Sequence, residues 1–197
     1  MFDYENKYLS LGKKYIAGID EAGRGPLAGP VATAIVIMPL GKEDIIDKVN
    51  DSKKLTEKMR EKLYEEIINK AISYHIELVD EQTIDTINIL NATKLGMLTC
   101  IENISIKPDI VLIDAVKLDT ECETESIIKG DALSYSIACA SILAKVTRDR
   151  YMLKLDEEYP QYNFKKHKGY GTKEHIENLK KYGKSPVHRE SFIKSFV

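Results

Sequence analysis

The stretch Gly18–Gly29, "GIDEAGRGPLAG", sets two carboxylates, Asp20 and Glu21, at the end of an apolar run, directly before a glycine-rich loop. The residues leading into it, "KYIAGID", are short, apolar and β-branched, which predicts a strand. The segment that follows, Pro30–Pro39, "PVATAIVIMP", predicts a second strand bracketed by prolines. Two strands joined by a short glycine loop favour an antiparallel pair. The two acids therefore stand beside a backbone that a ligand can approach closely.

Further along the chain, helical and strand patterns alternate. Apolar residues recur every four positions after a candidate N-cap, Thr56, and predict an amphipathic helix: Leu55, Met59, Leu63, Ile67 and Ala71. The segment "SYHIELVD" predicts a third strand, and Thr83–Ile104 a buried helix. A buried strand over Ile110–Ile113 ends in Asp114, and a short strand is expected around "SIIK".

The last third of the chain is mostly helical. The segment "GDALSYSIACASILAKVTRDRYM" predicts a helix whose small side chains let it lie close to a sheet, and "TKEHIENLKKYG" predicts another. The order of elements predicts an α/β fold with a mixed sheet. The length of 197 residues fits a single domain over 1–197, in which the polar, lysine-rich segment 159–197 forms a C-terminal helical appendage.

Composition excludes several classes of protein. The formal net charge is −2, so any nucleic-acid contact must come from local basic patches. The three cysteines are widely spaced, which indicates reduced thiols and a cytoplasmic protein. The N-terminal residues show no signal-peptide pattern, and no apolar run reaches the roughly 18 residues of a membrane span. We therefore expect no membrane contact.

The acids at strand ends suggest a metal site. Asp20 and Asp114 end predicted strands, and Asp131 follows a glycine just before a helix. Such carboxylates tend to gather at one edge of an α/β sheet, where two of them about 4 Å apart repel by roughly 4 kcal/mol. Cations relieve that repulsion, and all-oxygen ligands suit Mg²⁺ or Mn²⁺. From pattern alone the alternatives stay open: Asp131 as a helix N-cap, Asp114 as a turn former, Asp20–Glu21 as a solvated loop pair.

The glycine loop does not match the known phosphate-binding loops. Gly23, Gly25 and Gly29 approach a dinucleotide fingerprint, but a strand rather than a helix follows, and Pro26 interrupts the spacing. What remains is a loop whose backbone can approach a sugar or phosphate, with Arg24 as a charged donor.

A second candidate contact with nucleic acid is Tyr170, in "HKGYG". It lies among Lys165, Lys166 and Lys168, and an aromatic ring within a basic cluster is typical of nucleotide stacking; simple packing is the alternative. The four histidines show no metal-ligand spacing, and we assign His188 no catalytic role.

Six blocks in this sequence resemble the ribonuclease HII (type 2 ribonuclease H) family, in its order and at similar spacing, from about Tyr15 to Phe196. They are "GIDEAGRGPLAGPV", "DSKKL", "IDA", "KGD", "ASILAKVTRDR" and "HKGYGT". Departures are small: Val116 follows "IDA" where many bacterial members have a Gly-Asn type turn, and Cys139 replaces a usual alanine. We expect no additional N-terminal domain, which disfavours the related ribonuclease HIII.

The resemblance implies a ribonuclease H-like fold: a central mixed sheet flanked by helices, with a C-terminal helical segment. It implies endonucleolytic cleavage of the RNA strand of RNA–DNA hybrids, and nicking 5′ of single ribonucleotides embedded in duplex DNA. Two Mg²⁺ or Mn²⁺ ions per active site are implied, with products that carry 3′-OH and 5′-phosphate ends.

Residue roles follow from the same resemblance. The catalytic, metal-binding acids are Asp20, Glu21, Asp114 and Asp131. Residues expected to bind substrate are Gly23, Arg24 and Gly25 at the ribose 2′-OH and Tyr170 at the sugar of the adjoining deoxynucleotide. The motifs also place Lys53, Lys54 and Lys168 near the site, where we expect them to meet phosphates. A solvated helix entry is the alternative for Lys53 and Lys54.

Two other functions remain open at this stage: a non-catalytic nucleic-acid-binding module of the same fold, and a related two-metal nuclease or integrase. We expect a monomer whose partners are RNA–DNA hybrid and ribonucleotide-containing duplex DNA. The sequence assigns neither a protein partner such as a replication clamp nor a preference between Mg²⁺ and Mn²⁺.

Overall fold

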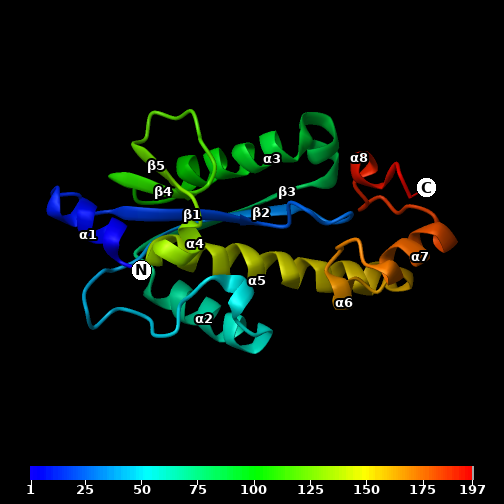
Figure 1. The fold of residues 1–197 in the computed structure, drawn as a ribbon, viewed down its shortest axis with the longest axis horizontal. Coiled ribbons are helices and arrows are strands. Elements are labelled where there is room, and N and C mark those ends of the chain that lie inside the picture. The colour runs from blue at the N-terminus through cyan, green and yellow to red at the C-terminus, as the bar shows by residue number, and fades with distance from the viewer. Residues whose placement is uncertain (197) are drawn as a thin grey trace.

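Five strands form one mixed sheet, and helices cover both of its faces (Figure 1). The computed structural model describes residues 1–196. The strands are β1 Ile16–Ala22, β2 Val31–Ile37, β3 Ser73–Val79, β4 Ile110–Asp114 and β5 Thr124–Ile127. The helices are α1 Asp3–Ser10, α2 Glu57–Lys70, α3 Glu81–Asn103, α4 Gly130–Leu133, α5 Tyr135–Glu158, α6 Phe164–His167, α7 Lys173–Tyr182 and α8 Glu190–Ile193. Two short 3₁₀ helices are η1 Ser52–Lys54 and η2 Pro160–Tyr162.

The strand order is β3-β2-β1-β4-β5. β1 is antiparallel to β2, which confirms the predicted pair, and β2 is antiparallel to β3. β1 is parallel to β4, and β4 is parallel to β5. In the β1–β4 register Ile19 pairs with Ile113, so the next residues, Asp20 and Asp114, come side by side toward the carboxyl ends of these two parallel strands.

The two faces of the sheet are covered by different helices. Alternate β2 residues Ala32, Ala34 and Val36 pack with α2 and α5, whereas Ile35 and Ile37 pack with α3. The predicted close approach of α5 is confirmed, because a Cβ built on Gly18 of β1 would lie only 2.1 Å from a backbone atom of Ser136. Helix α5 therefore runs tightly along β1 and carries its side chains to the sheet edge that holds the acids.

Helix α3 differs from the prediction of one buried helix over Thr83–Ile104. Asn88 has a φ of 66°, which breaks the helix, and its side-chain Oδ1 accepts from the Asn91 N–H to restart it. Leu90 and Leu95 are each 44% exposed, so α3 buries one face only. A polar residue that caps its own chain competes with helix continuation, which a count of apolar residues overlooks.

The region before α5 also differs in detail. Strand β5 begins at Thr124, two residues before the predicted "SIIK". Asp131 lies inside the short helix α4, and Ser134, whose hydroxyl accepts from the Ile137 N–H, caps the separate helix α5. The N-cap alternative for Asp131 is therefore wrong.

The C-terminal segment, with α6, α7 and α8, lies at the end of the sheet that carries the β1–β2 loop (Figure 1). The Leu27 N–H donates to the Gly169 carbonyl at 2.8 Å, and Ala28 forms a β-bridge with His188. The predicted helix in "TKEHIENLKKYG" is α7, capped by Thr172. Val197, the last residue of the predicted appendage, lies outside the described residues. None of the helices described is both long and apolar enough to cross a membrane.

Candidate active site

Three of the four predicted acids meet at the edge of the sheet. Asp20 comes from β1, Asp114 ends β4, and Asp131 stands in the first turn of α4. One carboxylate oxygen from each lies within 4.8 Å of the other two. The Gly130 N–H donates to Asp114 Oδ1 at 2.6 Å, which fixes α4 against the end of β4. The strand register and this bond bring together acids that lie up to 111 positions apart, from 20 to 131.

Burial makes the charged form of Asp20 and Asp114 costly. Asp20 is 4% exposed. Its burial raises the pKa of the carboxyl well above the usual range, and the charges of Glu21 and Asp114 raise it further. Burial also raises the pKa of Asp114, although the Gly130 N–H opposes that rise. A nearby cation would favour the ionised form of both groups.

Glu21 lies in the same pocket but outside the group of three. Arg24 lies 3.4 Å from its Oε1, while its Oε2 is buried without a hydrogen-bond partner among the described residues. Burial raises the pKa of Glu21, and the Arg24 charge opposes the rise. A buried carboxylate oxygen with no partner is normally costly, so it suggests that another group completes the site.

The residues present fit a divalent cation. The donors are carboxylate oxygens, which Mg²⁺ and Mn²⁺ prefer, and the unpartnered oxygen of Glu21 offers a further ligand atom. The pocket that contains Asp20, Glu21 and Asp114 has a volume of about 230 Å³ and also includes Gly23–Gly25 and Tyr170.

The glycine loop is fixed by two buried arginines that the sequence analysis did not single out. Arg148 of α5 and Arg189, just before α8, are 1% and 0% exposed. The three nitrogens of the Arg189 guanidinium donate to the carbonyls of Gly23, Arg24 and Gly29. Those of Arg148 donate to Ala28, Pro30 and Lys168. Gly23, with a φ of 95°, lies so near Arg148 that a Cβ would be 2.0 Å from Nε.

Tyr170 lies beside this loop. It is 43% exposed, and a Cβ on Gly25 would lie 3.9 Å from its ring. The Arg148 guanidinium is 5.9 Å from the ring centroid. An exposed aromatic ring next to the acids is available to pack against a sugar or a base.

The lysines are placed unequally. Lys53 Nζ lies 3.2 Å from Asp131 Oδ2 with an exposed side chain, so it stands at the edge of the acidic site. Lys54 and Lys165 are exposed, and Lys166 pairs with Glu174 at 2.6 Å. The Lys168 ammonium donates to the Lys165 carbonyl, and only 14% of its side chain is exposed.

Helix α5 supplies two further residues that the sequence analysis missed. Ser141 and Lys145 line the pocket of the acids, and the Ser141 hydroxyl lies 2.7 Å from that of Ser52, another residue of the pocket. Together with Arg148 they stand at spacing i, i+4, i+7, on one face of a helix whose other residues there are small or apolar. That polar stripe is the signal that could have identified them.

Removing one buried charge should stabilise the protein when no metal is present. A carboxyl whose folded pKa is raised makes the fold lose stability as pH rises from about 4 toward that folded pKa, so Asp20 costs the protein stability at pH 7. Asp20→Asn keeps an oxygen that can accept from the Glu21 N–H. We expect its free energy of unfolding in EDTA at pH 7 to rise, because the amide has no charged form to desolvate.

Urea unfolding at pH 7 and pH 4 measures this effect, with Asp119→Asn at an exposed site as the matched control. The gain should disappear at pH 4. An equal gain at both values would show that charge is not its cause.

Comparisons with known proteins agree with this geometry. The family model described as Ribonuclease HII matches residues 17–195. A Ribonuclease HII from Caldicellulosiruptor bescii is 57% identical over 197 residues, which is 100% of this chain and 95% of that protein.

Solved structures share the fold. The ribonuclease H2 from Pyrococcus horikoshii OT3 matches with a TM-score of 0.77 at 28% identity, over 93% of this chain and 97% of that one. The RNase HII from Archaeoglobus fulgidus, solved as a PCNA:RNase HII complex, matches with a TM-score of 0.77 at 28% identity, over 90% and 94%. The predicted ribonuclease H-like fold, including its helical C-terminal part, is confirmed. The match to the family model and the identity across the full length show that this chain belongs to the ribonuclease HII family.

Proposed function

We propose that this chain is an endoribonuclease that hydrolyses the RNA strand of RNA–DNA hybrids and nicks 5′ of single ribonucleotides embedded in duplex DNA. The observation that carries the proposal is one pocket in which the buried acids stand next to the Gly23–Gly25 loop and Tyr170. Hydrolysis and recognition of the ribose can therefore take place at adjoining atoms. Family membership supports the nuclease activity.

The four acids form the hydrolytic part of the site. Asp20, Asp114 and Asp131 would hold the metal through their converging oxygens, and Glu21 would contribute the oxygen that otherwise has no partner among the described residues. Two Mg²⁺ or Mn²⁺ ions, when bound, supply an activated water and stabilise the leaving 3′ oxygen. Lys53, beside Asp131, balances part of the negative charge and is placed to meet a phosphate.

The glycine loop and Tyr170 form the part of the site that recognises the sugars of the substrate. The 2′-OH is the group that distinguishes RNA from DNA at a single nucleotide, and a backbone without side chains at Gly23 and Gly25 can contact it directly. Tyr170 packs against the sugar of the next nucleotide, on the 3′ side. Residues 1–197 then act as one domain, in which the segment 159–197 supplies Tyr170 and the neighbouring lysines.

We further propose a monomeric, cytoplasmic enzyme. A replication clamp is a candidate protein partner, supported by the Archaeoglobus fulgidus RNase HII, which was solved in complex with PCNA. Gel filtration of this chain with the sliding clamp of its own cell tests that contact.

The proposed function is tested on a labelled DNA duplex that contains one ribonucleotide. With Mg²⁺ or Mn²⁺ we expect a single nick 5′ of the ribonucleotide, leaving 3′-OH and 5′-phosphate ends, and no cut in the all-DNA duplex. Binding without cleavage would instead indicate a non-catalytic module. Cleavage of the all-DNA control would indicate a nuclease that does not read the 2′-OH.

The lysines should control affinity without sequence preference. A combined Lys53→Glu, Lys54→Glu and Lys166→Glu variant is expected to weaken binding to all hybrid sequences alike and to flatten the dependence of log K on log salt. Each lost phosphate contact should change that slope by about 0.9. Fluorescence anisotropy between low and high salt measures the slope, with Lys42→Glu at an exposed site as the control. An unchanged slope would show that the substrate binds to another face of the protein. Lys168 should contribute least, because only 14% of its side chain is exposed.

A further inference from the structure

Two histidines in the C-terminal segment form a hydrogen-bonded pair that plays no part in the chemistry described above. His175 of α7 and His188 are 0% and 2% exposed, and their Nε2 atoms lie 3.0 Å apart. Their outer nitrogens also have partners. His188 Nδ1 meets Ser185, and His175 Nδ1 lies 2.9 Å from the backbone carbonyl oxygen of Tyr170. The contacts thus run from Ser185 through both rings to Tyr170.

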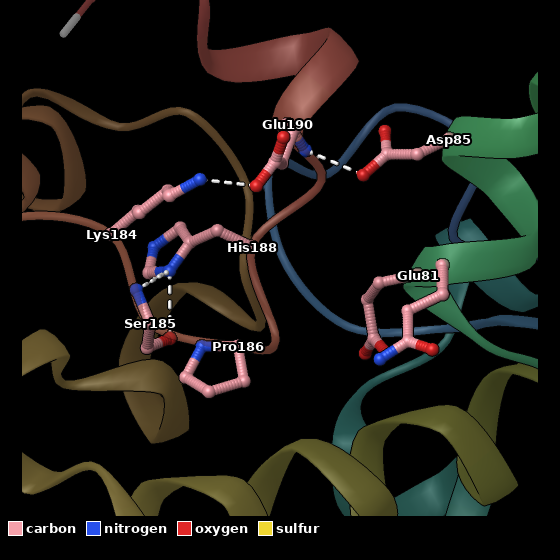
Figure 2. A pocket seen from close by; sticks show the side chains of 8 residues that line it. Glu81, Asp85, Lys184, Ser185, Pro186, His188 and Glu190 are labelled. Carbon is pink, nitrogen blue, oxygen red and sulfur yellow. Dashed lines mark hydrogen bonds and ion pairs between the residues drawn. The ribbon is translucent and has the colours of Figure 1, made fainter.

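A single backbone group determines where the protons lie. The Ser185 N–H can only donate, so His188 Nδ1, 3.0 Å away, must accept and carries no proton (Figure 2). The neutral His188 ring then has its proton on Nε2 and donates to His175 Nε2. The His175 proton is therefore on Nδ1, from which it donates to the Tyr170 carbonyl. The two rings are neutral and oppositely protonated.

Burial keeps both rings neutral. It lowers the pKa of His175 and of His188 to about 4 in each case. An additional proton on His175 would point two N–H groups at each other, and one on His188 would turn it away from the Ser185 N–H. Each link therefore depends on the others.

This series of hydrogen bonds joins the two parts of the proposed substrate site, the Gly23–Gly25 loop and Tyr170. The backbone of His188 bridges Ala28 in the loop that follows Gly23–Gly25, and the Gly29 N–H donates to the Val187 carbonyl at 2.9 Å. At the other end is Tyr170 itself. Among residues 1–196, the other hydrogen bonds that join these parts reach residues 168 and 169, through Arg148 and the Leu27 N–H, and Arg148 also lies 5.9 Å from the centre of the Tyr170 ring. The histidine pair adds a hydrogen bond to the backbone of residue 170.

We propose that His175 and His188 are positioning residues for ribonucleotide recognition, which hold Tyr170 at a set distance from the Gly23–Gly25 loop. The proposal rests on the proposed function, in which the loop and Tyr170 read adjoining sugars. Neither histidine touches the acids. Loss of the pair should therefore change how well a single ribonucleotide is recognised more than it changes hydrolysis of a long hybrid.

The protonation pattern can be observed directly. Long-range ¹H–¹⁵N spectra of the full chain, labelled at histidine and free of metal, distinguish the two neutral tautomers from imidazolium. At pH 7 we expect Nδ1–H for His175 and Nε2–H for His188. A charged ring, or the same tautomer in both rings, would contradict the series of hydrogen bonds from Ser185 through His188 and His175 to Tyr170.

Substitutions test the positioning role. His175→Leu removes the bond to Tyr170, whereas His175→Asn retains an amide N–H near the place of Nδ1–H. We expect His175→Leu to raise KM for a single embedded ribonucleotide and to lower kcat/KM about 10-fold, as small misplacements near a reacting centre do, with kcat on continuous hybrid little changed. His175→Asn should restore most of the loss. His75→Leu, on β3 and outside the pair, is the matched control.

The outcomes separate cleanly. Equal losses on both substrates, or no rescue by asparagine in a variant whose far-UV spectrum and melting match wild type, would show that His175 only supports packing. If the wild-type protein cleaves neither substrate, the proposed function is wrong, and so is the role of the histidines in recognition. The spectra still show whether the hydrogen bonds through the two rings exist.

Discussion

Loss of any one of the four acids is expected to lower the rate of cleavage with Mg²⁺ at least ~100-fold, which corresponds to about 2.7 kcal/mol. The variants are Asp20→Asn, Glu21→Gln, Asp114→Asn and Asp131→Asn. Each replaces a carboxylate by a neutral amide of the same shape at a site that we propose binds cations beside a phosphate. Initial rates on a duplex with a single ribonucleotide measure the effect.

Glu21 gives the sharpest comparison, because it lies outside the group of three aspartates whose oxygens converge. A rate of the Glu21→Gln variant near that of wild type would show that Glu21 is not a metal ligand and would leave the three aspartates as the proposed ligands. The same result for any aspartate would remove that residue. Asp119→Asn, at an exposed loop position, should cleave as wild type does.

Tyr170→Ala should lower cleavage at a single embedded ribonucleotide by about 10- to 100-fold. Stacking of this kind contributes ~1–3 kcal/mol by alanine substitution, and about 1.4 kcal/mol corresponds to a tenfold change in rate. Tyr170→Phe should keep most of the activity, because in the proposed role the face of the ring, and not the hydroxyl, packs against the deoxyribose. Continuous RNA–DNA hybrid should be affected less, so the ratio of the two rates should shrink.

Initial rates on both substrates for wild type and both variants test this role, with Tyr74→Ala, an exposed tyrosine of β3, as the control. If phenylalanine were as harmful as alanine, the hydroxyl would matter more than the ring. A constant ratio between substrates would reduce Tyr170 to packing.

Local patterns predicted the frame of this molecule well. The strand that ends in Asp114 was expected, and so was the strand that contains Asp20, although β1 continues past Asp20 to Ala22; short apolar runs bounded by turns are strong signals. Thr56 caps α2 as predicted, with its hydroxyl accepting from the Met59 N–H. The convergence of acids could also be expected, because it follows from strand ends meeting at one edge of a sheet.

The residues that hold the site in place could not be predicted from local sequence patterns. Arg148 and Arg189 look like ordinary surface charges in the sequence, and only contacts across more than 100 positions show that both are buried against the glycine loop. His175 and His188 show no metal spacing, and their pairing depends on how the C-terminal segment folds back. The break of α3 at Asn88 depends on a side chain that competes with the helix for a backbone N–H.

The binding of the glycine loop by Arg189 has a consequence for the direction of its peptide dipoles. A trans peptide is planar, so its C=O and N–H point in opposite directions. Because the carbonyls of Gly23 and Arg24 point at the Arg189 guanidinium, the N–H groups of Arg24 and Gly25 point away from it. The loop therefore presents the positive ends of two successive peptide units, which favour an oxygen lone pair over an N–H or a C–H. A buried cation on one side of a loop thus makes hydrogen-bond donors of its other side, with no polar side chain required for contact with a hydroxyl oxygen.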